Sequence, residues 1–402
     1  MRLPVIAKEK RSVLQLASAQ ALFQTASVMM VTASGVVGLS LAADKRLATL
    51  PVALTLVGAA IAMIPAALFM RRHGRRAGFL IGASLGGVAG LLAALAVHLH
   101  SFWLFAAASV LIGFYSGFAQ YYRFAAADVA SDAFRSRAIS WVVAGGVVAA
   151  VAGPNLVRVT QHGGDVPFLF TYLAMATLSV GALFVISRLS LPPMMSPQAA
   201  GTARPLWIIV RQPVYITAWI GSTVGFAVMT MVMTATPIAM LMCSHTMSDS
   251  TTVIQWHVLG MYVPSFFTGA LIRRFGVLAV MAAGIALLGV HVTIALSGIA
   301  FLHFVSGLTV LGVGWNFLFV GGTTLLTEAY QPAERAKAQA THDFLMLAVV
   351  SAGSFSAGGL LNAWGWEAVN LTVLPFLLLA ATATGALAWT RRLPQGAVQS
   401  SA

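Results

Sequence analysis

The sequence predicts an all-α membrane protein with twelve spanning helices, and its composition and length both support this. Of its 402 residues, 59% are apolar and only 8% are Asp, Glu, Lys or Arg, whereas soluble domains contain roughly a quarter charged residues. One span of about 20 apolar residues plus its loop takes about 33 residues, so the chain has room for about twelve. A soluble enzyme and a secreted disulfide protein are excluded, the latter because Cys243 is the only cysteine.

The basic residues predict the topology. Placing both termini on one side of the membrane puts 20 of the 23 Lys and Arg on that side, and leaves Lys45, Arg46 and Arg158 on the other. By the positive-inside rule both termini are cytoplasmic, in a bacterial inner membrane. The net charge of +13 therefore reflects topology, and we expect the lipid bilayer as partner and no nucleic acid. Hydropathy places the spans at 14–40, 47–70, 79–97, 102–124, 138–157, 168–190, 214–242, 252–272, 277–299, 302–326, 338–361 and 368–390.

The two halves of the chain repeat each other. The segment 67–74 after span 2 matches 269–276 after span 8, and Asp128 after span 4 matches Glu328 after span 10. Repeats at half the chain length indicate two pseudo-symmetric units. We therefore expect an N-terminal six-helix bundle, a Pro-rich cytoplasmic linker and a C-terminal six-helix bundle, at 1–191, 192–213 and 214–402.

The loop after span 2 resembles the Gly-x-x-x-Asp-Arg-x-Gly-Arg-Arg signature of the major facilitator superfamily. The resemblance covers essentially the whole chain and implies an alternating-access transporter, with its substrate site near the bilayer midplane. The sequence departs from the signature at Ala67, which replaces the first Gly. It also departs at Arg71, and at Arg273 in the second copy, where the family has the Asp that pairs across the bundles. The gating residues that the resemblance implies are Arg71, Arg72, Gly74, Arg75, Arg76, Arg273, Arg274 and Gly276.

Methionines gather early in the second half, where seven of the 17 lie between Met229 and Met261. Met229 and Met233 are four residues apart and share a helix face, as do His257 and Met261 on the next span. Both pairs fall near the middle of the membrane, where an ionisable side chain such as His257 usually marks function. Methionine is also a common filler of apolar cores, so simple packing is the alternative interpretation.

Thioethers and an imidazole without a carboxylate suit a soft cation, and copper(I) is the leading candidate. Hard cations such as magnesium or calcium demand oxygen ligands. We expect copper as the transported substrate, a cytoplasmic copper acceptor as partner, and no organic cofactor. The predicted metal ligands are Met229, Met233, His257 and Met261, and the predicted path from the outer face passes Met240, Cys243, His245 and Met247.

The stretches 229–240 and 253–261 resemble the copper-importer branch of the superfamily, the CcoA type, which supplies copper for assembly of cbb3-type cytochrome oxidase. The stretches 314–319 and 334–337 resemble the same branch. The resemblance implies that a Met-x-x-x-Met pair and a His-x-x-x-Met pair hold the metal. Riboflavin transporters are also close relatives, which leaves the substrate open.

Two other functions are alternatives to copper import. An organic-solute transporter, for riboflavin uptake or drug/proton antiport, would need a cavity of aromatic and hydrogen-bonding groups, and the Phe and Trp residues look scattered along the sequence. A non-transporting copper chaperone has no need of duplicated gating loops. An enzyme is not expected, because no nucleophile–His–acid constellation or phosphate loop is present.

One acidic residue near the start of span 11 is a candidate for proton coupling. Asp343 stands beside His342 inside the predicted span boundary, and ionisable groups within spans often belong to proton relays. The alternative is that Asp343 only stabilises the N-terminal end of its own helix.

Overall fold

The computed structural model describes residues 3–131, 134, 138, 141–142, 144–191 and 204–392. In the first half these form α1 (Leu3–Leu41), η1 (Lys45–Leu47), α2 (Leu50–His73), α3 (Arg75–His98), α4 (Phe102–Ala119), α5 (Tyr122–Val129), α7 (Gly145–Thr160) and α8 (Leu169–Ser187). In the second half they form α9 (Leu206–Val210), α10 (Pro213–Met242), α11 (Met247–Tyr262), α12 (Ser265–Phe275), α13 (Val277–Ser297), α14 (Phe301–Leu326), η2 (Pro332–Glu334), α15 (Arg335–Leu371) and α16 (Val373–Thr390).

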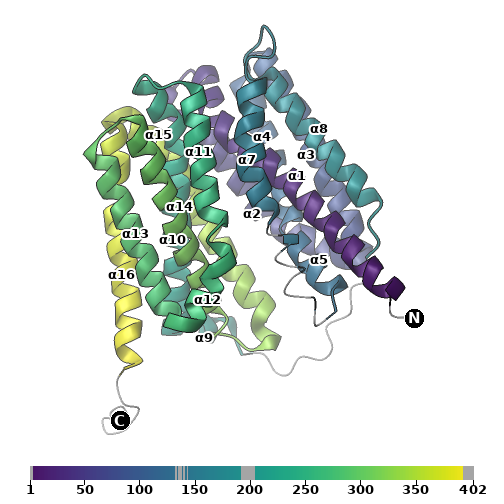
Figure 1. Cartoon of the computed structure of the whole chain (residues 1–402), viewed down its shortest axis with the longest axis vertical. Helices are drawn as coiled ribbons and strands as arrows, with labels where there is room; N and C mark the ends of the chain where they lie inside the picture. The colour runs from purple at the N-terminus through teal and green to yellow at the C-terminus, as the bar shows by residue number, and fades with distance from the viewer. Residues whose placement is uncertain are drawn as a thin grey trace.

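The helices form two groups that follow the chain order. In the first half α1 packs on α7 and α8, and α3 packs on α4 and α8. In the second half α10 packs on α14 and α15, and α13 packs on α14. The start of α1 and the end of α16 lie at the lower end of the molecule in Figure 1. We call that end the terminal end and the opposite one the distal end. The predicted bundle limits stay predictions, since most of the linker (192–203) lies outside the described residues.

The all-α membrane fold is confirmed. Nine helical stretches in the described part of the chain are long and apolar enough to cross a membrane. These nine stretches contain ten of the twelve predicted spans, and the other two, spans 5 and 8, have shorter helices as counterparts. Span 5 corresponds to α7, which has 16 residues. Span 8 is divided into α11 and α12, which have 16 and 11 residues. Spans 11 and 12 are joined in one stretch, Lys337–Thr390.

The loops after spans 2 and 8 have the same backbone conformation. Gly74 has φ 86° and ψ 154°, and Gly276 has φ 87° and ψ 154°. Glycine adopts this left-handed region at little cost, which explains the residue type at both positions. Two copies of one unusual turn, about half the chain apart, agree with the sequence repeat.

The repeated acidic residues are both paired, with different partners. Asp128 forms an ion pair with Arg75 at 2.5 Å, whereas Glu328 pairs with Arg391 at 2.6 Å. Arg135 and Arg137, which the repeat aligns with Arg335 and Lys337, lie outside the described residues. The two halves therefore share their loop geometry and differ in their ion pairs.

Arg204 anchors the end of the segment that connects the two halves to the second half. Its guanidinium binds the Glu334 carboxylate at 2.8 and 2.7 Å, and its backbone N–H donates to the same carboxylate at 2.8 Å. Glu334 also accepts from the backbone N–H of Gln331 at 3.0 Å and is completely buried. Hydrogen bonds from Arg204 and from Gln331 lower the pKa of Glu334 to about 2, from an ordinary 4.5.

Glycines allow α2 and α4 to cross with their backbones in close contact. A Cβ at Gly113 would lie 2.2 Å from the Thr55 carbonyl oxygen, and one at Gly58 would lie 2.4 Å from that of Val110. Small residues at such crossings let spanning helices approach closely, and van der Waals packing then stabilises the pair.

We predict that Gly113→Ala destabilises the protein by about 1–3 kcal/mol, because the added methyl group must push two backbones apart. Thermal unfolding of the detergent-solubilised protein would show a lower midpoint. Gly385→Ala on α16 is the control, since a Cβ there meets no atom within 4 Å. An equal effect of both substitutions would contradict the proposed crossing.

The Arg204–Glu334 anchor predicts a pH dependence of stability. Because the folded-state pKa of Glu334 is lowered from 4.5 to about 2, its contribution is complete above 4.5 and is lost as pH falls toward 2. The difference in unfolding midpoint between wild type and Glu334→Gln should therefore be constant near neutral pH and shrink below pH 4.5. Glu328→Gln is the control, because its ion pair is about half exposed and such surface pairs contribute about 0–1 kcal/mol. A difference that does not change with pH would disprove the assignment.

Candidate functional site

The two halves are joined at the distal end by Thr49, which precedes α2. Its hydroxyl donates to the carbonyl of Phe355 at 3.2 Å and accepts from the backbone N–H of Gly358 at 3.2 Å. Thr49 is completely buried, so these bonds are shielded from water. They connect α2 of the first half to α15 of the second.

A second distal contact joins α7 to α11. Asn155 donates to the Gln255 side-chain oxygen at 3.1 Å, and Arg158 donates to the Thr252 hydroxyl at 2.6 Å. Within the described residues, every hydrogen bond that joins 3–191 to 213–392 involves these two helix pairs. The structure is therefore closed between the halves at the distal end.

Below these contacts, an apolar cluster lies where the halves meet. Its buried members from the first half are on α1 and α7, and those from the second half are on α10, α11 and α14. Phe226, Tyr262 and Phe319 pack against it. We call this set the interface cluster; its buried members are Val28, Ala149, Ala150, Met229, Met233, Ile254, Val258, Met261 and Trp315.

The structure brings three of the four predicted metal ligands into the interface cluster. Met229, Met233 and Met261 are 4%, 7% and 8% exposed there. The fourth, His257, is completely buried, and its Nδ1–H donates to the Leu308 carbonyl of α14 at 2.8 Å. This bond directs the imidazole toward the α11–α14 contact inside the second half, and Nε2 of His257 has no hydrogen-bond partner within the part of the chain that the structure describes.

Three aromatic rings of the second half form a continuous surface in the interface cluster. Trp315 and Phe319, one turn apart on α14, are stacked at 5.0 Å with 10° between their planes. Phe226 on α10 lies 5.7 Å from Phe319 and 6.1 Å from Trp315. Sequence reasoning missed this group, although the spacing of Trp315 and Phe319 was a usable signal.

Asn316 holds α14 against the break between α11 and α12. Its amide donates to the Met261 carbonyl at 2.8 Å and to the Ser265 hydroxyl at 2.6 Å, and its oxygen accepts from Thr268 at 2.6 Å. Asn316 is completely buried. Because Asn316 follows Trp315 directly, this network also holds the stretch of α14 backbone that carries Trp315.

The four residues predicted along the path for copper do not converge. Met240 is buried in the core of the second half, and Cys243 packs against that core. His245 donates to the Ile299 carbonyl at 2.8 Å, while Met247 packs against a core cluster of the first half. Their side chains therefore have separate environments. The prediction rested on their closeness in the sequence, which does not show where each side chain packs.

The predicted gating residues lie at the terminal end. Arg71, Arg72, Arg273 and Arg274 are exposed, Arg75 pairs with Asp128, and Arg76 donates to the Ser187 carbonyl. Two turns into α15, His342 and Asp343 are hydrogen-bonded to each other at 2.8 Å. Their gating and coupling roles stay predictions.

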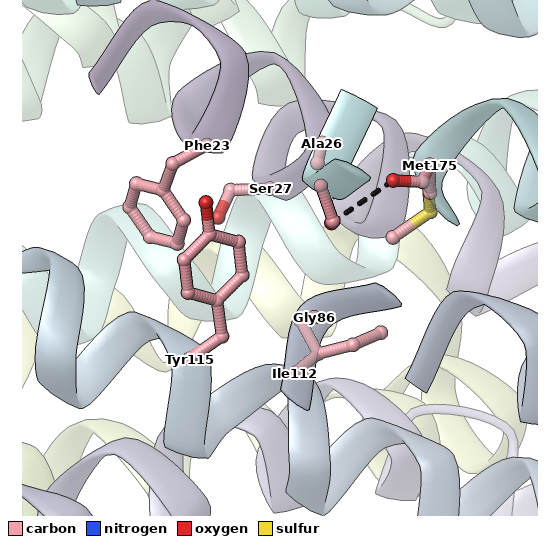
Figure 2. Close-up of a pocket in the computed structure, with 8 residues that line it drawn as sticks. Phe23, Ala26, Ser27, Gly86, Ile112, Tyr115 and Met175 are labelled. Carbon is pink, nitrogen blue, oxygen red and sulfur yellow. Dashed lines mark hydrogen bonds between the residues drawn. The ribbon is translucent and has the colours of Figure 1, made fainter. Parts of the chain in front are cut away.

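A small cavity inside the first half is a separate feature. Figure 2 shows the Tyr115 hydroxyl pointing toward Ser27, with Phe23, Ile112 and Met175 around it. Phe23 and Tyr115 meet edge to face at 4.8 Å, and among the described residues no hydrogen bond reaches the Tyr115 hydroxyl. Lying among α1, α3, α4 and α8, this cavity is not between the halves.

Comparison with known proteins identifies the class. Residues 16–254 match the family model of the Major Facilitator Superfamily. A crystal structure of the nucleoside transporter NupG has the same fold, with a TM-score of 0.70 at 17% identity, over 93% of this chain and 99% of that one. The chain belongs to the Major Facilitator Superfamily, and it is a multi-pass membrane protein.

Three transporters are similar to this chain in sequence over most of its length. The chain is 42% identical over 373 residues to the riboflavin transporter RfnT of Brucella anthropi, covering 92% of this chain and 94% of RfnT. It is 28% identical to two uncharacterised MFS-type transporters of Bacillus subtilis. The match to YddS covers 82% of this chain and 79% of YddS. The match to YdeG covers 87% of this chain and 86% of YdeG.

The prediction of copper import is wrong. The relative at 42% identity over nearly the whole chain is named a riboflavin transporter, not a copper importer. The spacing of the Met and His pairs was read as a ligand set, but that spacing shows only which residues share a helix face. No finding tests the predicted cytoplasmic acceptor, the absence of an organic cofactor or the absence of a nucleic-acid partner, and these stay predictions.

The distal contacts predict how the equilibrium between conformations responds to mutation. Arg158→Ala removes a hydrogen bond from a charged donor, worth about 1.5–3 kcal/mol, which should favour opening of the distal end about tenfold or more. The rate of maleimide labelling at Thr234→Cys, in a Cys243→Ser background, would measure this opening. Thr234 is 2% exposed, and its carbonyl lies close to Gly35 of α1 in the other half. Arg46→Ala is the control, because the Arg46 side chain is 70% exposed and pairs with Asp44 in its own loop. Equal labelling rates in all three proteins would exclude a closing role for Arg158.

Proposed function

We propose that this chain transports riboflavin across a bacterial inner membrane by alternating access. Two observations support this function: the 42% identity to a riboflavin transporter over nearly the whole chain, and the aromatic surface between the halves. The structure contributes the aromatic surface, which offers a chemical basis for binding riboflavin.

The isoalloxazine ring of riboflavin is a flat heteroaromatic system. Such rings bind by stacking on aromatic side chains, worth about 1–3 kcal/mol per ring for nucleobases. Trp315, Phe319 and Phe226 supply neighbouring aromatic faces at the meeting of the two halves. The Trp315 indole N–H, to which no other described residue is hydrogen-bonded, can donate to a carbonyl or ring nitrogen of the flavin.

The methionines fit this site in a different role from metal binding. Met229, Met233 and Met261 lie in the same cluster as Trp315, and thioethers make favourable contacts with aromatic rings. Their flexible side chains can repack around a ring as the halves separate. In the closed arrangement, Val28 and Ala149 lie against these groups, so movement of the first half exposes the aromatic surface.

The charge distribution supports uptake into the cytoplasm. If both termini are cytoplasmic, as the positive-inside rule predicts, the distal contacts of Thr49 and Arg158 close the outer side. Substrate held at the interface cluster then leaves toward the terminal end. The family transports solutes, and we propose no catalytic reaction.

Riboflavin uptake by cells tests this function directly. A bacterial strain that cannot make or import riboflavin should grow at low external riboflavin when it expresses this chain, and should accumulate radiolabelled riboflavin. Equal growth and accumulation with an empty vector, at verified membrane expression, would refute the function.

We predict that Trp315→Ala weakens riboflavin binding about 5- to 150-fold, corresponding to loss of about 1–3 kcal/mol of stacking. Quenching of riboflavin fluorescence by the purified protein would measure the dissociation constant. Trp389→Ala is a matched control in the same half, since Trp389 is 66% exposed on α16. If both variants bind as wild type does, the aromatic surface is not the flavin site.

A further inference from the structure

One buried hydrogen-bond acceptor lies beside the interface cluster without a partner. His257 on α11 is completely buried, and its Nδ1 lies 2.8 Å from the carbonyl oxygen of Leu308 on α14. A carbonyl oxygen only accepts, so Nδ1 carries the proton, and Nε2 of the neutral imidazole is an acceptor. No described residue is hydrogen-bonded to this Nε2. Because buried polar atoms usually have a partner, Nε2 is available to a donor on a bound ligand.

His257 lies on α11 between the interface cluster and the residues that pack on α14. At about 100° per residue, it is about 40° from Met261, a member of the cluster, and about 60° in the other direction from Gly260, which faces α14. Helical side chains point back toward the helix N-terminus, so the side chain at i+4 lies over the residue at i. The Met261 side chain therefore lies toward His257, and a ligand that enters the cluster meets both.

Two glycines hold His257 in place, because they bring α11 and α14 into close contact. A Cβ at Gly260 would lie 2.6 Å from the carbonyl oxygen of Thr309, and one at Gly312 would lie 2.4 Å from that of His257. Backbones this close fix the two helices relative to each other, and the bond to Leu308 fixes the direction of the ring. An acceptor that is fixed before binding loses little conformational entropy when its ligand arrives.

The aromatic surface lies about one helical turn from this acceptor. Asn316 donates to the carbonyl of Met261 at 2.8 Å, so Trp315, the preceding residue, is level with Met261. His257 is four residues before Met261, which places it about 6 Å nearer the distal end. The three fused rings of riboflavin are longer than that. A flavin ring that lies on the aromatic surface at Trp315 can therefore bring one edge to His257.

The first half offers this acceptor no donor within the interface cluster. The buried members of the cluster from that half are Val and Ala residues, and their side chains carry no polar atom. When the halves separate, the partner of Nε2 must come from the substrate or from water. The isoalloxazine ring carries one N–H, at N3, between the carbonyls at C2 and C4. Its other ring nitrogens and both carbonyls only accept.

We infer that His257 is a specificity-determining residue of the substrate site, and that its Nε2 accepts a hydrogen bond from the imide N–H of a flavin. The inference rests on the proposed riboflavin transport, and it adds the edge of the ring that the protein recognises. The aromatic surface binds any flat ring, whereas His257 selects rings with a donor at this edge. A site built to accept from a substrate N–H rejects analogues that lack it.

Analogues of riboflavin test this contact in the wild-type protein. 3-Methylriboflavin cannot donate at N3 and should bind about tenfold or more weakly than riboflavin, because it leaves the buried acceptor unpaired. Lumiflavin has the same ring without the ribityl chain, and it should lose affinity by a similar factor when N3 is methylated. Competition against riboflavin, followed by quenching of riboflavin fluorescence, gives each dissociation constant. Equal affinities of riboflavin and 3-methylriboflavin would overturn the inference.

His257→Phe separates recognition from packing, because it keeps a ring of similar size without the acceptor. Riboflavin then buries its imide N–H unpaired, whereas 3-methylriboflavin has no such group to lose. The ratio of the dissociation constant of 3-methylriboflavin to that of riboflavin should therefore fall about tenfold. A histidine that only packs would change both dissociation constants together, and an unchanged ratio would rule out the proposed role.

His291→Phe is the matched control in the same half. His291 is also completely buried, and its Nδ1 also donates to a carbonyl of α14, that of Gly307 at 2.9 Å. Its Nε2, unlike that of His257, has a partner, the side-chain oxygen of Asn370 at 3.1 Å. This variant should keep the wild-type ratio. A fall in the ratio equal to that in His257→Phe would show that loss of any buried histidine disturbs the site, and would overturn the assignment.

The outcomes separate this inference from the function on which it rests. Absence of both riboflavin binding and riboflavin uptake in wild type would refute the proposed function and the inference together. Uptake of riboflavin without discrimination at N3, or with discrimination that His257→Phe retains, would overturn the role of His257 alone. The analogue series in wild type gives this answer even if the His257 variant fails to fold.

Discussion

The hydrocarbon of a bilayer offers backbone groups no hydrogen-bond partner, and this constraint underlies the whole architecture. It favours helices for spans, and it makes the polar side chains inside them bond locally. Thr32 and Thr236, for example, donate to the carbonyls four residues earlier, at 2.7 Å each. Other polar groups bond across helices, among them Thr49 at the contact between the halves, Asn316 with Met261, His257 with Leu308, and Ser222 with His342.

The same constraint separates the two kinds of contact between the halves. At the distal end, side-chain and backbone hydrogen bonds join α2 to α15 and α7 to α11. Deeper in the molecule the contact is apolar and holds Trp315 and the three methionines. This arrangement suits a transporter. The distal hydrogen bonds can break together, while the apolar interface cluster repacks around a substrate.

The error about copper has a physical cause. Periodicity correctly places Met229 and Met233 on one helix face, and the structure puts them in one cluster with Met261. Sharing a face does not define a coordination site, however, because ligand geometry depends on how neighbouring helices orient each side chain. His257 shares that spacing with Met261, yet its bond to Leu308 directs its ring toward α14. The aromatic surface depends on α10 and α14, which are far apart in the sequence, and so it looked scattered there.

The sequence by itself determined the membrane class, the all-helical fold, the positions of the spans and the internal repeat, because hydropathy, charge and turn residues such as Gly74 act locally. Tertiary structure alone decided which distant residues meet: Thr49 with Gly358, Phe226 with Trp315, and Ser222 with His342. These contacts depend on how the helices cross and rotate against one another. Those angles follow from packing across the whole molecule, such as the close approach of Gly58 and Gly113, and no single stretch of sequence specifies them.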